Sequence, residues 1–266
     1  MKRSSRFGKI ILIAAVVMLL LTLGMMYLNA LREQNNTYIS IDPDTVELVQ
    51  LNEPKEGDPI AVVDTDLGEV RFVLYPDYSP EAVKNFTELA ESGYYDGTCF
   101  FDCDGGAYAA GGSKKADGSV DTNDARERIP RTLDQDLWPL RGAVCLVNTS
   151  VERGVKEYIF GGGKYYCGSR FEFVNTIEFT DDIKEEMRST ETLGELTEAF
   201  ISKGGVPNFS QQMTIIGQVY EGLDVVEALS SVESQSNGLY MLPKEEIRIR
   251  SVTIGTYAPQ KDENKG

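Results

Sequence analysis

Nineteen consecutive residues without a charge, Ile10 to Leu28, divide this 266-residue chain into two parts with different physical constraints. As an α-helix, this run would be about 28 Å long at ~1.5 Å per residue, which matches the hydrocarbon core of a bilayer. Four basic residues precede it, so the positive-inside rule places residues 1–9 in the cytoplasm and everything after the helix outside. The sequence therefore predicts a single-pass protein of the cell membrane with an extracytoplasmic domain.

A cleaved signal peptide is the alternative interpretation of the same segment. The apolar run is longer than the usual apolar region of a signal peptide, and Leu28-Asn29-Ala30 is a poor cleavage site. We therefore favour an uncleaved transmembrane anchor at 10–28, followed by a polar, acidic stalk at 29–57. The compact domain is expected at 58–257, with a disordered tail at 258–266.

The charge of the chain excludes one class of partner. The residues after position 30 hold all 42 acidic residues and 22 of the 26 basic ones, a net charge of −20. Such a surface repels nucleic acid, so we expect none as a partner. The chain has no histidine, and its cysteines lack the two close pairs of a typical zinc site, so we expect no metal and no cofactor. One disulfide and free buried thiols both remain open for the cysteines, which are Cys99, Cys103, Cys145 and Cys167.

Short apolar runs separated by turn residues predict a mainly β domain. Residues 60–63 and 69–74 flank a turn at 64–68, which is the pattern of a hairpin. Many short strands with few helices fit a closed antiparallel barrel, which has no exposed sheet edges, although the pattern alone would also allow a sandwich. The other strands are expected at 143–147, 171–174, 213–219 and 247–254.

Two helices and two insertions complete the predicted domain. A helix is expected from Ser79 as N-cap and Pro80 as first residue to Gly93, and a second at 223–229. The insertions, at about 149–167 and 178–205, fit neither strand nor turn patterns. We interpret the first as a flexible surface loop and the second, which is acidic, as partly helical around 193–203.

Five sequence blocks carry a family resemblance. Residues 93–113, GYYDGTCFFDCDGGAYAAGGS, resemble GYYDGTxFHRVxxxFMxQGGD of the cyclophilins, a family of peptidyl-prolyl isomerases. Further on, RGAVCLVN from Arg141 resembles RGxLSMAN, and GSRFEF from Gly168 resembles GSQFFI. Residues 204–219 and 221–226 resemble GGTPWLDGxHTVFGQV and EGMDVV. The blocks stand in the family's order over about 58–257, which implies a closed cyclophilin-like β-barrel with two capping helices.

The resemblance also implies where the site lies. In cyclophilins an apolar pocket grips the proline ring, and an arginine donates hydrogen bonds that weaken the amide resonance of the X-Pro bond. The position of that arginine is Asp102 in this chain, which reverses the charge where a donor is needed. The resemblance implies substrate-binding positions at Phe100, Tyr108, Glu172, Phe209 and Met213, with Ala107 and Asn208 beside them. Glu172 would place a charge in a slot that should be dry.

Arg170 is the candidate catalytic residue that remains. It stands at a glutamine of the family that lies beside the arginine, so its guanidinium could reach the same carbonyl, or it could pair with Asp102 or Glu172. Two functions follow from these residues. One is a membrane-anchored isomerase acting on X-Pro bonds of secreted chains, with weak or lost catalysis. The other is a non-catalytic binding or scaffold module for an extracytoplasmic protein.

Overall fold

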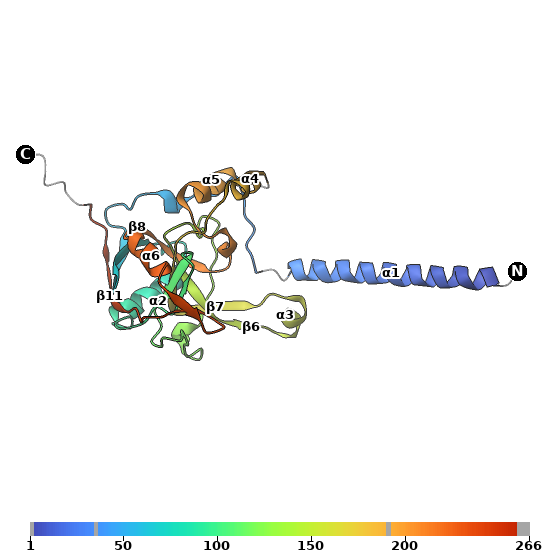
Figure 1. The fold of residues 1–266 in the computed structure, drawn as a ribbon, viewed down its shortest axis with the longest axis horizontal. Helices are drawn as coiled ribbons and strands as arrows, with labels where there is room; N and C mark the ends of the chain where they lie inside the picture. The colour runs from blue at the N-terminus through green and yellow to red at the C-terminus, as the bar shows by residue number, and fades with distance from the viewer. Residues whose placement is uncertain (1–2, 35–36, 190–192, 260–266) are drawn as a thin grey trace, which may run out of the picture. The chain divides into compact units, whose positions relative to one another are not determined.

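The computed structural model describes residues 3–34, 37–189 and 193–259 (Figure 1). Contacts divide the chain into two units, residues 1–37 with 151–164 and residues 38–150 with 165–266. In the first unit, α1 (Arg3–Gln34) is one continuous helix. Within the described ranges, no helix is long and apolar enough to cross a membrane. The anchor stays a prediction, and residues 260–266 of the expected tail lie outside the described residues.

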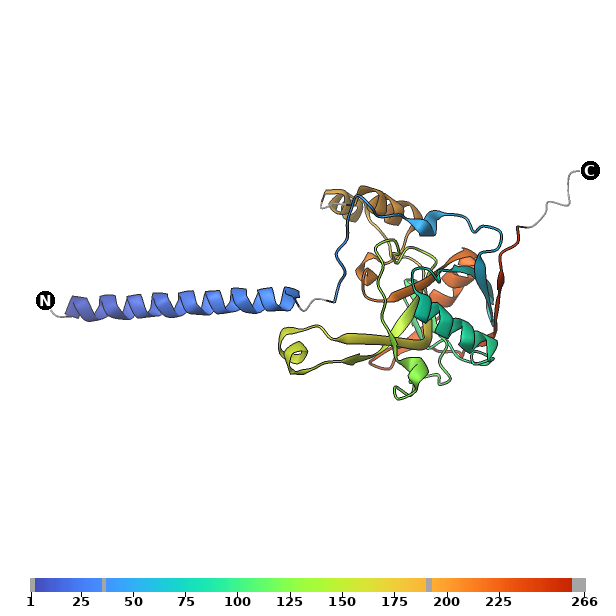
Figure 2. The ribbon, with the colours of Figure 1, turned by 180° about the vertical axis from the view of Figure 1, so that it is seen from behind.

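One antiparallel sheet forms the body of the second unit (Figures 1 and 2). Its strands follow the order β11-β1-β2-β8-β6-β7-β4-β3, with β5 beside β7. β9 (Ser234–Ser236) and β10 (Met241–Pro243) form a separate hairpin. The strands of the sheet are β1 (Pro59–Thr65), β2 (Gly68–Leu74), β3 (Asp102–Asp104), β4 (Tyr108–Gly111), β5 (Ile129–Pro130), β6 (Ala143–Glu152), β7 (Lys164–Val174), β8 (Thr214–Glu221) and β11 (Ile249–Thr256).

The prediction of a closed barrel is wrong, because the sheet is open between β11 and β3. An irregular segment lies in the gap. Its backbone amides at Phe100 and Phe101 donate to Ile247 O and Ala110 O, one on each side of the gap. Cys99 adds isolated bridges to Ser113 and Arg248, but the segment forms no regular strand in the described part of the chain. Gly97 has a φ of 74°, a left-handed conformation that turns the chain tightly just before the segment.

Two helices cover the sheet where the sequence predicts them. α2 (Pro80–Glu91) begins with its proline in the first turn, and α6 (Leu223–Ser230) begins after Gly222. Ser79 stands at the N-cap position as predicted, but its side chain makes no capping hydrogen bond. The Ser79 hydroxyl donates to Ile215 O at 2.8 Å instead of accepting from the helix. Ser79 therefore ties α2 to β8, since a buried hydroxyl is satisfied by whichever partner the fold brings close.

The main core lies between the sheet and these two helices. Phe86 of α2 packs edge-on against Phe171 of β7, with ring centroids 5.6 Å apart, and Phe72 and Phe173 extend the aromatic cluster. Phe171 and Phe173 point inward because alternate residues of a strand share one face. Glu172, the residue between them, therefore faces the other side of β7. All four cysteines are free and buried.

The two insertions are more ordered than the sequence indicates. The first holds the outer ends of β6 and β7 with a short helix between them, α3 (Val155–Phe160), where we expected a flexible loop. The second contains α4 (Asp181–Ser189) and α5 (Gly194–Lys203), and the helix expected around 193–203 is confirmed. α5 packs Leu196 and Phe200 against Trp138. Single 3₁₀ turns occur at η1 (Val49–Leu51), η2 (Ala125–Glu127) and η3 (Pro207–Phe209).

Residues 38–57, which we expected to belong to a stalk, lie against the second unit. The Ile39 amide donates to Gln211 Oε1 at 2.8 Å. Gln50 is buried, accepts from the Trp138 amide at 2.6 Å and donates to Gln218 Oε1 at 2.8 Å. Contacts of the domain thus extend about twenty residues before the predicted boundary at 58, because the buried Gln50 needs hydrogen-bond partners and finds them on Trp138 and Gln218.

Candidate functional site

Three adjacent strands bring the two predicted acidic positions together. Asp102 on β3 pairs with Ala110 on β4, and Ala110 pairs with Glu172 on β7. Residues directly opposite one another in a sheet share a face, so both carboxyl groups lie on the same side. That side is opposite to the aromatic core, since Glu172 alternates with Phe171 and Phe173.

Asp102 is buried and held by its own chain. Its Oδ1 accepts from the Met241 amide at 2.8 Å, and its Oδ2 accepts from the Tyr108 hydroxyl at 3.1 Å. Burial raises the pKa of Asp102, while these two hydrogen bonds lower it and Asp104 raises it further. The group at this position is therefore an acceptor, and both of its oxygens already have a donor.

Glu172 is a carboxyl group with an unsatisfied oxygen. The residue is 5% exposed, and its Oε1 has no hydrogen-bond partner. Burial, and after it the charge of Asp102, raises the pKa of Glu172 to about 8. Burial, and after it Glu172, also raises the pKa of the Cys145 thiol. At neutral pH the side chain is therefore largely protonated, because a buried carboxylate without a partner is costly.

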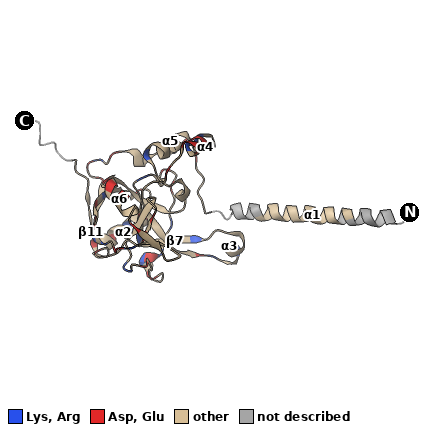
Figure 3. Cartoon of the chain, in the orientation of Figure 1, with Lys and Arg blue, Asp and Glu red and all other residues tan. Residues whose placement is uncertain are grey.

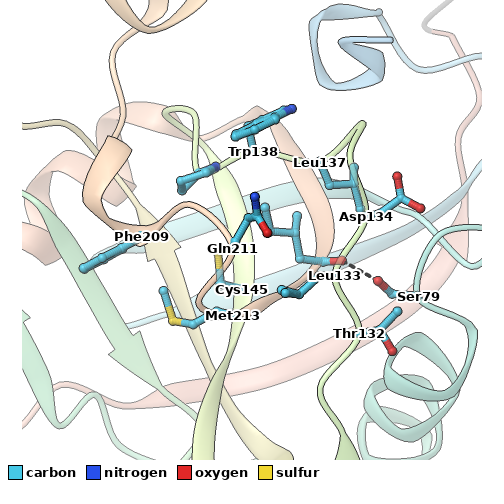
Figure 4. Close-up of a pocket in the computed structure, with 12 residues that line it drawn as sticks. Ser79, Thr132, Leu133, Asp134, Leu137, Trp138, Cys145, Phe209, Gln211 and Met213 are labelled. Carbon is cyan, nitrogen blue, oxygen red and sulfur yellow. Dashed lines mark hydrogen bonds between the residues drawn. The ribbon is translucent and has the colours of Figure 1, made fainter. Parts of the chain in front are cut away.

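Three of the predicted substrate-binding residues, Tyr108, Phe209 and Met213, come from neighbouring parts of the fold and are partly buried. The rings of Tyr108 and Phe209 meet at 5.4 Å, while the Tyr108 hydroxyl reaches Asp102. Phe209, Met213 and Ala107 pack against one apolar cluster around Cys145 and Ile215. Figure 4 shows the small cavity that remains beside Phe209 and Met213, which has a volume of about 10 Å³. A cavity of that size has room for roughly one water molecule and not for a pyrrolidine ring.

The structure does not bring Phe100 to the other substrate-binding candidates. Phe100 is fully buried in the main core, with its ring 6.5 Å from that of Phe173. Gly111 lies directly under it, and a β-carbon there would come within 3.0 Å of the ring. The Phe100 side chain therefore belongs to the main core and lies apart from the other candidate residues.

Arg170 is also buried, at 4% exposure, and its donors are engaged. Nη1 donates to Gly118 O at 2.7 Å and to the Tyr240 hydroxyl at 2.9 Å, and Nη2 donates to Asn148 O at 3.2 Å. The guanidinium carbon lies 5.3 Å from the centre of the Phe101 ring. The salt bridge to Asp102 or Glu172 that the sequence allowed is absent from the described part of the chain. Only Nε has no partner.

The β9–β10 hairpin is the part of the site that sequence reasoning missed. Two consecutive residues of it, Tyr240 and Met241, contact Arg170 and Asp102 respectively. The Tyr240 ring also packs edge-on against Phe101 at 5.0 Å. An Asn-Gly pair at 237–238 is a hairpin signal and could have predicted the turn. Nothing in that signal predicts that the hairpin covers the two positions of interest.

The family profile for "Cyclophilin type peptidyl-prolyl cis-trans isomerase/CLD" matches residues 60–254 of this chain. The chain belongs to the cyclophilin-type isomerase family. Curated relatives include a "Putative peptidyl-prolyl cis-trans isomerase" of Staphylococcus saprophyticus, 26% identical over 77% of this chain and 96% of the relative. A "Putative bifunctional phosphatase/peptidyl-prolyl cis-trans isomerase" of Streptococcus pyogenes is 25% identical over 79% of this chain but only 41% of its own length.

Solved structures agree with the cyclophilin fold. A cyclophilin-type isomerase of Cryptosporidium parvum, crystallised in the presence of the dipeptide Ala-Pro, superposes with a TM-score of 0.54 over 74% of this chain and 99% of its own. The two sequences are 19% identical, so this similarity supports the fold alone. Two buried acids, Asp102 and Glu172, stand at positions where the sequence resemblance implies an arginine and an apolar contact.

Proposed function

We propose that this cyclophilin-type protein has weak or lost isomerase activity and acts as a non-catalytic module that binds polypeptide segments, proline-containing or from another extracytoplasmic protein. The observation that carries the proposal is the state of Asp102, which accepts hydrogen bonds from Met241 and Tyr108 where catalysis requires a donor. The cavity beside Phe209 and Met213 also supports the proposal, since it is too small to hold a proline ring.

The chemistry of the reaction sets the size of the expected loss. Uncatalysed X-Pro isomerisation takes tens to hundreds of seconds, because resonance holds the amide planar. One preorganised donor typically lowers a barrier by ~3 kcal/mol, so its loss alone costs ~10²-fold in rate. Arg170 would have to break its bonds to Gly118 and Tyr240 before it could replace that donor.

An isomerase assay tests this proposal directly. We expect the full chain in detergent to isomerise a proline tetrapeptide at the uncatalysed rate, with an active cyclophilin as positive control. Asp102→Arg alone should not restore turnover, because Tyr108 and the buried Glu172 would still stand at two positions where the resemblance places apolar contacts to the proline ring. Turnover of the unmodified chain at the rate of the positive control would refute lost catalysis.

We also propose that the protein is anchored in the cell membrane through residues 10–28, with the domain outside. The uncharged run and the four basic residues before it support this orientation. Protease added to intact cells should then remove the domain and leave the anchor behind. A mature protein that begins after Leu28, or a domain that resists protease until the cells are lysed, would contradict this topology.

A further inference from the structure

The tip of the β6–β7 arm exposes apolar side chains. This arm comprises residues 151–164, and its short helix α3 leaves Val155, Tyr158 and Ile159 at 80%, 83% and 57% exposure. Their spacing of three and four residues places them on one side of the helix. Isolated exposed apolar residues are ordinary, but a contiguous set of this kind marks a surface that contacts another apolar phase.

The arm also differs in charge from the rest of the protein. It contains three basic residues, Arg153, Lys156 and Lys164, against two acidic ones, a net charge of +1. Figure 3 colours the basic and acidic residues of the described chain. All residues after position 30 together carry −20. All three basic side chains are exposed. An apolar tip flanked by exposed basic groups is the composition of a segment that lies in the interface of an anionic bilayer.

The docked N-terminal segment limits how far the domain can be from the membrane. Ile39 is already bound to Gln211, so only residues 29–37 separate the predicted anchor from the second unit. Nine residues span at most ~32 Å even when fully extended. A free stalk of 29 residues would have allowed about three times that distance. Because residues 38–57 belong to the second unit, most of that length does not act as a spacer.

The arm and the N-terminal segment join the second unit at the same place. The Ile39 amide donates to Gln211 Oε1, and the Arg131 guanidinium donates to the carbonyl oxygen of the next residue, Gln212. The same guanidinium lies over the ring of Tyr165, where the arm returns to the unit, with 4.3 Å between the guanidinium carbon and the ring centre. Ile39, which follows the N-terminal segment, and Tyr165, which follows the arm, are therefore linked within the second unit through Arg131 and residues 211–212.

We propose that the apolar side of α3 lies in the headgroup region of the bilayer that holds the anchor. This inference rests on the proposed membrane anchoring. Val155, Tyr158 and Ile159 would enter the interface to a depth of about 5–10 Å, while Lys156 and Lys164 contact anionic headgroups. The arm thus gives the domain a second membrane contact, which fixes its orientation on the bilayer.

Site-specific labelling tests the contact in the full chain. The four native cysteines are buried, so a new surface cysteine can be labelled selectively with an environment-sensitive fluorophore. Three single variants are reconstituted in phosphatidylcholine–phosphatidylglycerol vesicles with lipid-attached nitroxide quenchers: Tyr158→Cys on the arm, Met18→Cys in the anchor, and Leu239→Cys as control. Leu239 is an equally exposed apolar residue on the other hairpin, at 76% exposure.

We expect the label at position 158 to lose about half of its fluorescence to the lipid quenchers, and the label at position 239 to lose none. Adding Val155→Ser and Ile159→Ser should abolish the quenching at 158 and leave that at 18 unchanged. Quenching at 18 without quenching at 158 would overturn the arm contact and leave the anchor standing. No quenching at either position would refute both proposals. A label at position 158 that is shielded from water but is not quenched by the lipid nitroxides would mean that the tip contacts a protein. That result would overturn the inference.

Discussion

Replacing Glu172 by glutamine is expected to stabilise the fold by about 4–5 kcal/mol at pH 8 and above, and by almost nothing near pH 4.5. The folded protein keeps the Glu172 proton up to a pKa of about 8, whereas the unfolded chain releases it near the ordinary value of 4.5. Between these two pH values the folded state binds more protons than the unfolded state. The stability of the unmodified protein must therefore fall as the pH rises through this window, and glutamine removes that dependence.

Chemical denaturation of both proteins between pH 4 and pH 9 measures this difference. Glu91→Gln on the exposed face of α2 is the matched control, and its free energy of unfolding should follow that of the unmodified protein across the range. Equal stability of Glu172→Gln and the unmodified protein at every pH would mean that the Glu172 carboxyl finds a partner or reaches solvent, contrary to the buried, unsatisfied Oε1.

Replacing Arg170 by glutamine, the residue that the family resemblance places there, is expected to lower the free energy of unfolding by about 2–4 kcal/mol. The loss arises because the carbonyls of Gly118 and Asn148 and the hydroxyl of Tyr240 lose a charged donor inside the protein. We expect the variant and the unmodified chain to isomerise proline peptides at the same rate, since the guanidinium already donates to these three partners.

Arg250→Gln provides the control for this substitution. Arg250 is exposed and pairs with Asp64 and Asp66 at the surface, so its loss should change stability by no more than about 1 kcal/mol. A variant at position 170 that keeps its stability but isomerises more slowly than the unmodified chain would identify Arg170 as the catalytic donor. The proposal of lost catalysis would then have to be given up.

Local signals in the sequence were sufficient for most of the secondary structure. Pro80 and the apolar spacing after it predict α2, and the turn residues at 64–68 predict the β1–β2 hairpin that the structure contains. Both signals work because helix starts and tight turns depend on backbone preferences of a few neighbouring residues. Ser79 occupies the N-cap position, but the partner of its hydroxyl, Ile215, is distant in sequence, and no local signal predicts that hydrogen bond.

Tertiary structure decided which side of each strand carries the site. The family motif places Phe100 and Glu172 together as substrate contacts, but the pleat of the strands puts Phe100 in the main core and Glu172 on the opposite face. The motif also gives no sign that the sheet stays open at β3, where an irregular segment joins it to β11. Both outcomes depend on pairing between segments that are far apart in the chain.

The sequence by itself determined that this chain is a cyclophilin-type protein and that an acid stands where the family's catalytic arginine would be. The residue type at a position that matches a family motif can be identified from the sequence alone. Only the tertiary structure decided what that acid does, because its state depends on Met241 and Tyr108, which the folded chain brings to its two oxygens. Arg170 shows the same division, since its partners lie 22, 52 and 70 residues away and only folding places them around one guanidinium. Hydrogen-bond partners of buried groups are set by the packing of distant segments, which no local pattern encodes.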